Sequence, residues 1–187
     1  MKKIILASNS PRRRELLAGL GYDFEVRVID GIDESYPHSL PADKVPQYIA
    51  DRKAEAYTVS DDEILITADT VVIVDDDVLG KPLDADDARR MLHALSGKTH
   101  HVVTGVCIRT ADQHRNFAVR TNVTFKKLSD DEIAHYIAHY RPFDKAGAYG
   151  IQEWIGYIGV TGIEGSYFNV MGLPVQRIYE ELRTIED

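Results

Sequence analysis

The chain has 187 residues, of which 44% are hydrophobic and 28% are charged, so it can bury a sizeable core and is not expected to be disordered. Its net charge of −8 argues against a general nucleic-acid-binding surface, and no apolar run has the length of a signal peptide or a membrane span. The single cysteine, Cys107, excludes an internal disulfide framework and fits a reducing compartment. We therefore expect a cytoplasmic protein with no nucleic-acid or membrane partner.

The first expected elements are a buried strand over residues 4–6 and a helix that begins at Pro11, with Ser10 as its N-cap. Three consecutive arginines, residues 12–14, occupy the first turn of this helix, where cations oppose the helix dipole. Either they are solvated, or an anion lies among them. Hydroxyl groups, backbone N–H groups and guanidinium groups at such a turn favour a phosphate, although no P-loop pattern is present.

A second strand is expected over residues 24–28, followed by an acidic loop over residues 30–34 and a helix over residues 43–58 that contains Lys53. The loop carboxylates suggest a metal site if they lie beside a phosphate site. Taken alone, the loop is more typical of a solvated surface.

In the strand expected over residues 63–74, Asp69 interrupts a largely apolar run and is the only charged residue after Glu63. A carboxylate in such a strand must be paired, bound to a metal or placed at the mouth of a cleft, because an unpaired buried charge is too costly. Residues 75–77 are expected to form a hairpin turn. The loop over residues 79–82 then offers Lys81, which could return towards Asp69.

The next segments read as a helix over residues 85–96 capped by Asp84, an antiparallel hairpin of residues 102–109 and 115–127, and a helix that begins after Ser129. Cys107 lies in an apolar strand, where core packing is favoured over nucleophilic chemistry. Two histidine pairs raise the question of a metal. His100 and His101 point to opposite faces of a strand, and the pair at residues 135 and 139 is typical of an exposed helix face.

The loop over residues 144–152 contains small residues that allow close approach to a ligand, together with Lys145 and Gln152. Lys145 could contact a phosphate, and Gln152 could form hydrogen bonds with a base. We expect a strand over residues 154–160, a turn over residues 162–166 and a final helix after Pro174.

Five motifs occur in order along the chain: ASNSPRR from residue 7, ADTVV from residue 68, GKP from residue 80, DKAGAYGIQ from residue 144, and GSY followed by GLP from residue 165. With these motifs the chain resembles the Maf family of nucleoside triphosphate pyrophosphatases from near residue 4 to near residue 182. The resemblance implies an α/β fold related to inosine triphosphate pyrophosphatases, with a long bent mixed sheet flanked by helices and two lobes around a deep cleft. It also implies a single domain over residues 1–187, a homodimer and a divalent metal, Mg²⁺ or Mn²⁺.

The resemblance further implies roles for individual residues. Asp69 matches the proton acceptor of the family, although its position is equally consistent with holding the metal. The loop before Glu34 is one residue longer than in some relatives, so either Asp33 or Glu34 could take the second acidic position. The other matched positions are Arg12, Thr70 and Gln152 for nucleotide choice, and Ser8, Arg13, Lys53, Lys81 and Lys145 for the phosphates, with Glu34 and Asp69 for the metal.

Within the family, arginine, threonine and glutamine at the three specificity positions look like the branch that acts on dTTP and UTP. The branch that acts on 7-methyl-GTP typically has tryptophan and glutamate at the latter two. Two other functions stay open: a pyrophosphatase for modified or non-standard nucleotides, and a non-catalytic nucleotide-binding regulator of cell division.

Overall fold

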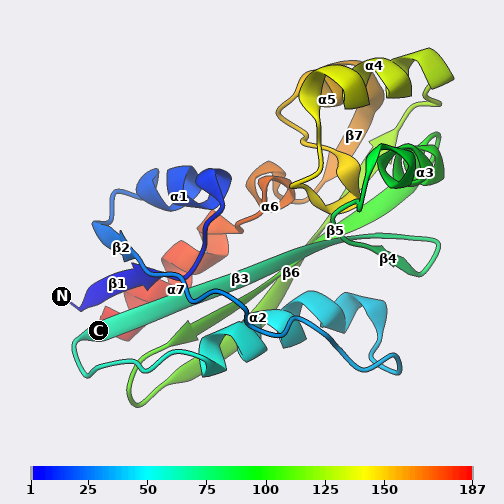
Figure 1. The fold of residues 1–187 in the computed structure, drawn as a ribbon. Helices are drawn as coiled ribbons and strands as arrows, with labels where there is room; N and C mark the ends of the chain where they lie inside the picture. Colours follow the sequence, from blue (N-terminus) through cyan, green and yellow to red (C-terminus); the bar gives the residue numbers. More distant parts are fainter. Residues whose placement is uncertain (1, 187) are drawn as a thin grey trace. The chain divides into compact units, whose positions relative to one another are not determined.

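The computed structural model describes residues 2–186 and contains a mixed α/β arrangement (Figure 1). Seven strands form one open sheet in the order β2-β1-β3-β5-β6-β7, with β4 paired to β3. The strands are β1 (Lys3–Leu6), β2 (Phe24–Val26), β3 (Glu63–Val74), β4 (Asp77–Leu79), β5 (Thr99–Arg109), β6 (His114–Phe125) and β7 (Val160–Glu164). The expected α/β class with a mixed sheet flanked by helices is confirmed.

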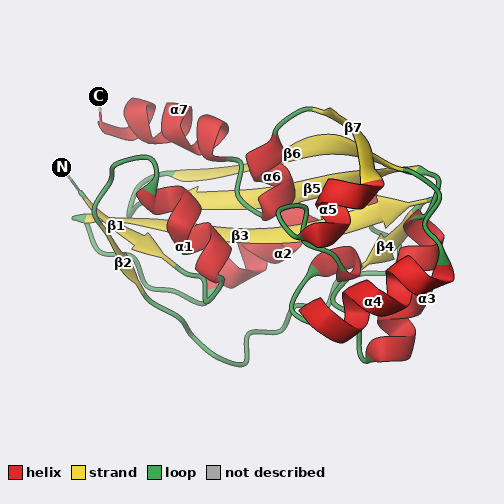
Figure 2. Ribbon diagram, turned by 90° about the horizontal axis from the view of Figure 1, so that it is seen from above, coloured by secondary structure: helices red, strands yellow, loops and turns green. Residues whose placement is uncertain are grey.

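Seven α-helices lie within the described residues (Figure 2). They are α1 (Pro11–Ala18), α2 (Val45–Glu55), α3 (Ala85–Leu95), α4 (Asp130–Tyr140), α5 (Trp154–Gly159), α6 (Tyr167–Met171) and α7 (Val175–Glu186), with short 3₁₀ turns at Ala42–Lys44 and Ala146–Ala148. Across residues 2–186, no helix combines the length and the apolar character that crossing a membrane requires.

The chain forms two compact units. Unit 1 consists of residues 1–69, 104–119 and 172–187, and unit 2 of residues 70–103 and 120–171. Each unit has its own apolar core.

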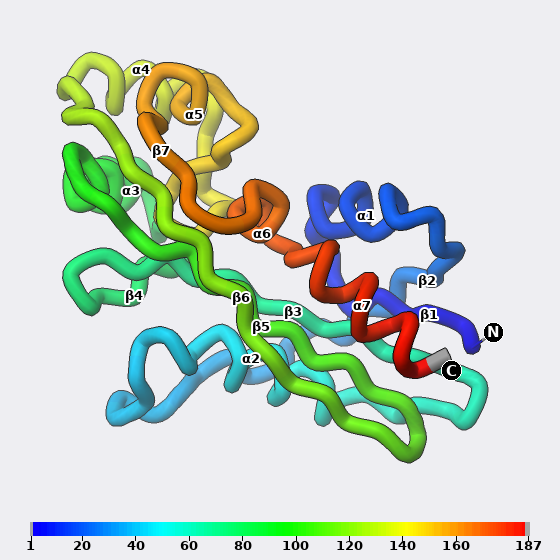
Figure 3. The backbone as a smooth tube through the Cα atoms, turned by 180° about the vertical axis from the view of Figure 1, so that it is seen from behind, coloured from blue at the N-terminus to red at the C-terminus, as the bar shows by residue number. Residues whose placement is uncertain are grey.

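In unit 1, β1 pairs in parallel with both β2 and β3. Successive side chains of a strand point to opposite faces, and the core follows that alternation. Ile4 and Leu6 pack with Leu17 of α1 and Ile178 of α7, whereas Ile5 packs on the other face with residues of α2. Figures 1 and 3 accordingly show α1 and α7 on one side of these strands and α2 on the other.

The cysteine of unit 1 belongs to the core beneath α2. Cys107 is fully buried and packs with Ala50 and Ala54, which confirms the prediction of core packing. Burial and the nearby carboxylate of Asp51 raise the pKa of the Cys107 thiol to about 12, so it is not a nucleophile at neutral pH.

In unit 2, α3 and α4 pack against the inward faces of the strands, with Leu92, Val123 and Tyr136 fully buried. The turn between β3 and β4 uses Asp75 and Asp76 at positive φ, 49° and 67°, which is the two-residue hairpin geometry expected for residues 75–77.

Two neighbouring predictions in unit 2 are wrong. Residues 154–159 form helix α5 and not a strand, and strand β7 runs from Val160 to Glu164, so it occupies residues 162–164, where a turn is predicted. The apolar run is short enough that period two and period 3.6 both fit it, and burial of Ile155 and Gly159, four residues apart, selects the helix. A Cβ at Gly156 would lie 1.8 Å from the carbonyl oxygen of Ile151, so glycine is required where the preceding loop crosses this helix.

Candidate active site

The turn between β1 and α1 has the capping predicted from sequence. The Ser10 hydroxyl accepts a hydrogen bond from the backbone N–H of Arg13 at 3.4 Å, and Pro11 is the first helical residue. The Ser8 hydroxyl, which is nearly buried, accepts from the N–H of Ser10 at 3.2 Å. Two N–H groups of the turn are therefore bound to hydroxyls of the chain itself.

The three arginines that follow have different surroundings. Arg13 turns inward and donates from Nε to the carbonyl of Gly172 at 2.8 Å and from Nη1 to that of Ala68 at 3.0 Å. Burial lowers the pKa of Arg13, while the charges of Asp69 and Glu34 oppose that shift.

The two neighbouring arginines, Arg12 and Arg14, have other surroundings than Arg13. Arg14 donates to the Asn9 side chain at 3.2 Å and to the carbonyl of Ser8 at 3.4 Å. Arg12 is half-buried, and its charge reaches the Arg13 guanidinium.

Asp69 lies close to Lys53 of α2. The Lys53 ammonium is 3.1 Å from Oδ1 of Asp69 and 3.2 Å from Oε1 of Glu34, and it also contacts the carbonyl of Ala68 at 3.4 Å. The side chains of Lys53 and Asp69 are 15% and 14% exposed, whereas that of Glu34 is 55% exposed. The neighbouring Asp33 accepts a hydrogen bond from the N–H of Ser35, so Glu34 is the residue of the pair that contacts Lys53.

The environment of Asp69 perturbs its ionisation. Burial raises the pKa of this carboxyl, and the positive charges of Lys53 and Arg13 offset that effect only in part. A carboxylate whose pKa is raised by burial takes up a proton more readily than an exposed aspartate does. The carboxylates of Glu34 and Asp69 both contact the Lys53 ammonium, so their oxygen atoms face a common position. Oxygen atoms arranged in this way are the ligands that a hard divalent cation requires.

Unit 2 contains the remaining predicted residues. Lys145 is 11% exposed, and its ammonium lies 2.9 Å from Asp144 and 3.3 Å from Oε1 of Glu153. The Tyr136 hydroxyl donates to Oε1 of Glu153 at 2.9 Å and accepts from the N–H of Gly150 at 2.9 Å. A Cβ on Gly150 would lie 2.5 Å from Glu153, so glycine permits this close approach.

Sequence reasoning did not identify Tyr136 and Glu153 as members of this network. The only signals were that Tyr136 falls on the inward face of a predicted helix and that Glu153 follows Gln152. Neither signal connects the two residues, which are 17 positions apart.

The loop of Lys81 is held to the loop of Lys145, because the N–H of Gly147 donates to the carbonyl of Gly80 at 3.1 Å. Thr70, on β3, is half-buried. Oε1 of Gln152 is buried and has no hydrogen-bond partner among residues 2–186. A buried acceptor without a partner costs about 1–3 kcal/mol, so this atom is suited to receive a donor from a ligand.

The histidine pairs behave as expected. His100 is fully buried and contacts the Tyr149 hydroxyl at 2.5 Å, whereas His101 contacts Asn122 at 2.7 Å. The rings of His135 and His139 stack on α4 with centroids 4.1 Å apart, and His135 also contacts Trp154.

These observations define an α/β protein in which a largely buried carboxylate is paired with a lysine and affected by the charge of an arginine. The chain belongs to the Maf family, because residues 3–185 match the family of Maf-like proteins. It is 62% identical over 185 residues to a dTTP/UTP pyrophosphatase of Phocaeicola vulgatus, covering 98% of this chain and 96% of that protein. It is 61% identical over 183 residues to a dTTP/UTP pyrophosphatase of Parabacteroides distasonis, covering 97% of this chain and 95% of that protein.

Proposed function

We propose that this protein is a hydrolase that cleaves dTTP and UTP between the α and β phosphates, releasing the nucleoside monophosphate and pyrophosphate. Its similarity to relatives named dTTP/UTP pyrophosphatase over nearly its whole length supports this activity. The observation that carries the proposal is Asp69, a carboxylate with a raised pKa that contacts Lys53 and is also affected by the charge of Arg13.

In this proposal Asp69 accepts the proton of the attacking water. The ammonium of Lys53 keeps the carboxylate ionised and oriented before the reaction, because it is 3.1 Å from Oδ1. Lys53, Arg13, Lys81 and Lys145, with Arg12 and the Ser8 hydroxyl, bind the triphosphate and offset the charge that develops on the leaving pyrophosphate.

A divalent cation, Mg²⁺ or Mn²⁺, is part of the proposal. The donor set fits such an ion, since Glu34 and Asp69 supply hard oxygen atoms that already share one cation. When bound, the ion would add positive charge beside the phosphate oxygens and favour ionisation of the water.

We propose that Gln152 selects the base, assisted by Thr70 and Arg12. The unpartnered Oε1 of Gln152 can accept the N3–H of uracil or thymine, and its amide N–H groups can donate to a base carbonyl. A site that leaves an acceptor unsatisfied discriminates against a base without the matching donor.

The test is pyrophosphate release from dTTP, UTP, CTP, GTP, 7-methyl-GTP and inosine triphosphate, with Mg²⁺, with Mn²⁺ and with a chelator. We expect metal-dependent release led by dTTP and UTP. The Asp69→Asn variant should lose turnover while keeping its fold, and Asp77→Asn, which removes an exposed carboxylate, should retain it.

Other results would redirect the proposal. Faster hydrolysis of inosine triphosphate or another non-standard nucleotide would indicate a pyrophosphatase for modified nucleotides. Binding without release from any nucleotide would contradict enzymatic activity and leave a nucleotide-binding regulator. Wild-type turnover by Asp69→Asn would exclude the proposed role of that residue.

The proposal also includes a single catalytic domain over residues 1–187, a homodimer and a cytoplasmic location, which rest on the sequence and the family resemblance. Light scattering on the purified chain measures the oligomeric state directly, and a monomer at micromolar concentration would contradict the dimer.

A further inference from the structure

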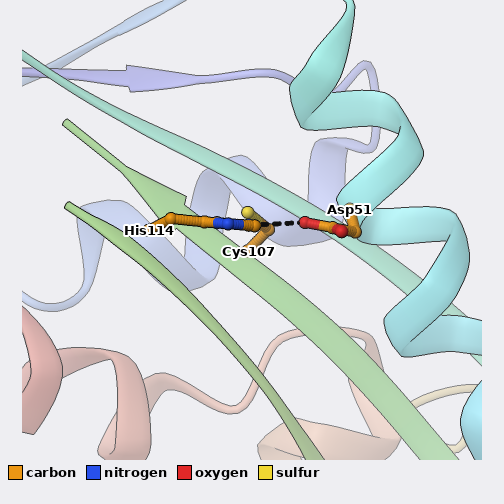
Figure 4. A group of neighbouring side chains, drawn as sticks. All are labelled: Asp51, Cys107 and His114. Atoms are coloured by element: carbon orange, nitrogen blue, oxygen red, sulfur yellow. Dashed lines mark hydrogen bonds and ion pairs between the residues drawn. The ribbon is translucent and has the colours of Figure 1, made fainter. Parts of the chain in front are cut away.

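Three side chains in unit 1, outside the proposed active-site set, converge from different elements (Figure 4). They are Asp51 of α2, Cys107 of β5 and His114 at the start of β6. Nε2 of His114 lies 2.5 Å from Oδ1 of Asp51, and one ligand atom from each of the three residues lies within 4.8 Å of the others. Cys107 is fully buried, whereas the side chains of His114 and Asp51 are 52% and 32% exposed.

The elements that carry these residues are packed closely together. A Cβ on Gly105, two residues before Cys107 on the same face of β5, would lie 2.3 Å from backbone atoms of Pro46 and Gln47. Gln47 and Asn116 each donate a side-chain hydrogen bond to the other's carbonyl at 3.3 Å. Gln47 is one helical turn before Asp51, and Asn116 is two residues after His114, so these contacts fix the separation of α2 and β6 beside the cluster.

A thiol, an imidazole and a carboxylate form a donor set that favours particular metals. Sulfur and nitrogen ligands suit zinc and similar transition-metal ions, whereas Mg²⁺ and Ca²⁺ prefer oxygen alone. Bond lengths of about 2.0–2.3 Å in a tetrahedral zinc site place the ligand atoms roughly 3.3–3.8 Å apart. The three ligand atoms lie within 4.8 Å of one another, and Nε2 of His114 and Oδ1 of Asp51, which are 2.5 Å apart, would need to separate by about 1 Å.

We propose that Asp51, Cys107 and His114 form a binding site for a zinc-type transition-metal ion, with water as the fourth ligand on the exposed side. The Cys107 thiol would release its proton to solvent as the ion binds the sulfur. The ion would link α2 to the hairpin of β5 and β6. The site is distinct from the oxygen donors Glu34 and Asp69, which contain neither sulfur nor imidazole.

The experiment uses Co²⁺ as a spectroscopic substitute for zinc in the untagged full-length protein. Cys107 is the sole cysteine of the chain, so any cobalt–thiolate charge-transfer band must arise from this residue. We expect one equivalent of Co²⁺ to give that band and one equivalent of Zn²⁺ to abolish it. Absence of the band in the wild-type protein would overturn the proposal.

Variants assign the other ligands. Cys107→Ser should lose the band, and His114→Ala and Asp51→Asn should each weaken Co²⁺ binding about tenfold or more. Glu34→Gln, which alters the proposed active-site donors, and His139→Ala, which alters an exposed histidine elsewhere, should leave the band and the affinity unchanged.

These variants separate the new site from the proposed catalytic site. An unchanged band in both His114→Ala and Asp51→Asn would contradict the ligand set, even if Cys107→Ser fails to fold. Loss of the band in a folded Glu34→Gln variant would show that binding at Cys107 depends on Glu34, and would contradict a site that is distinct from the active-site donors. Because the readout is spectroscopic, it stands whether or not the protein hydrolyses dTTP.

Discussion

Gly105 is a sensitive position of unit 1, although it lies in no predicted motif. Its substitution by alanine adds one methyl group to β5, at a point where the new Cβ atom would lie 2.3 Å from the backbone of Pro46 and Gln47. Carbon atoms pack at about 3.5–4.0 Å, so the first turn of α2 would have to move by about 1.2 Å or more. The neighbours are backbone atoms, and no side chain can rotate away to relieve the contact.

The displacement should affect both stability and activity. Overpacking of this kind typically costs about 1–3 kcal/mol, and we expect Gly105→Ala to lower the free energy of unfolding by about 3 kcal/mol. Lys53 lies on the same helix, and a shift of about 1 Å in a catalytic group can reduce the rate about 100-fold. We therefore expect a folded but destabilised variant whose kcat for dTTP falls by about that factor.

Urea denaturation and pyrophosphate release at a temperature where the variant is fully folded would measure the two effects. The matched control is Gly162→Ala in β7, where an added Cβ meets nothing closer than 3.9 Å and the free energy of unfolding should change by less than about 0.5 kcal/mol. A Gly105→Ala variant with the stability and kcat of the wild-type protein would refute the reasoning.

Three further predictions concern ionisable groups and hydrogen bonds. Lys53→Met removes a charge that lowers the pKa of Asp69, so the acid limb of the pH profile of kcat/KM should move to higher pH. The control variant Lys44→Met, which removes an exposed charge, should leave that limb in place. An unmoved limb in Lys53→Met would contradict the role of Asp69 as base. Tyr136→Phe removes a hydroxyl that donates to the Glu153 carboxylate and accepts from the buried N–H of Gly150. Urea denaturation should show that the free energy of unfolding falls by about 1–3 kcal/mol. An unchanged urea midpoint would argue against this hydrogen-bond network. Burial lowers the pKa of His100 from 6.5 to about 3, so below pH 6.5 the unfolded chain binds a proton that the native chain does not. The free energy of unfolding should therefore fall by about 1.4 kcal/mol per pH unit as the pH decreases below 6.5. The same dependence of stability on pH in His100→Leu would exclude this cause.

Local sequence signals predicted most elements of the fold, but not helix α6 or the position of β7. Ser10 before Pro11 begins α1, and Ser129 with Glu132 forms a complete capping box at the start of α4. These signals succeed because donor and acceptor are within three residues of each other, so tertiary structure hardly affects them. The misassigned residues 154–159 lacked a cap and were too short to show a distinct period.

Asp69 could be singled out from sequence, because a lone carboxylate in an apolar strand is costly unless it is paired. Its partners could not be assigned in the same way. Lys53 is 16 residues away and looks like an ordinary helix-surface lysine in the sequence, and only the packing of α2 brings it to 3.1 Å. Contacts of this kind depend on tertiary structure, and family resemblance was the only indication of them.

The arginine run shows why counting charges in a sequence overstates a phosphate site. Successive residues of a helix point about 100° apart, so three adjacent arginines cannot all face the same ligand. Arg13 binds two backbone carbonyls, and Arg14 supports the preceding turn through Asn9 and Ser8. Two of the three arginines therefore bind groups of the protein itself: Arg14 binds the turn before the helix, and Arg13 binds carbonyls distant in the sequence. Replacing Arg13 should accordingly reduce stability in the absence of nucleotide, because the carbonyls of Gly172 and Ala68 would each lose a hydrogen bond from its guanidinium.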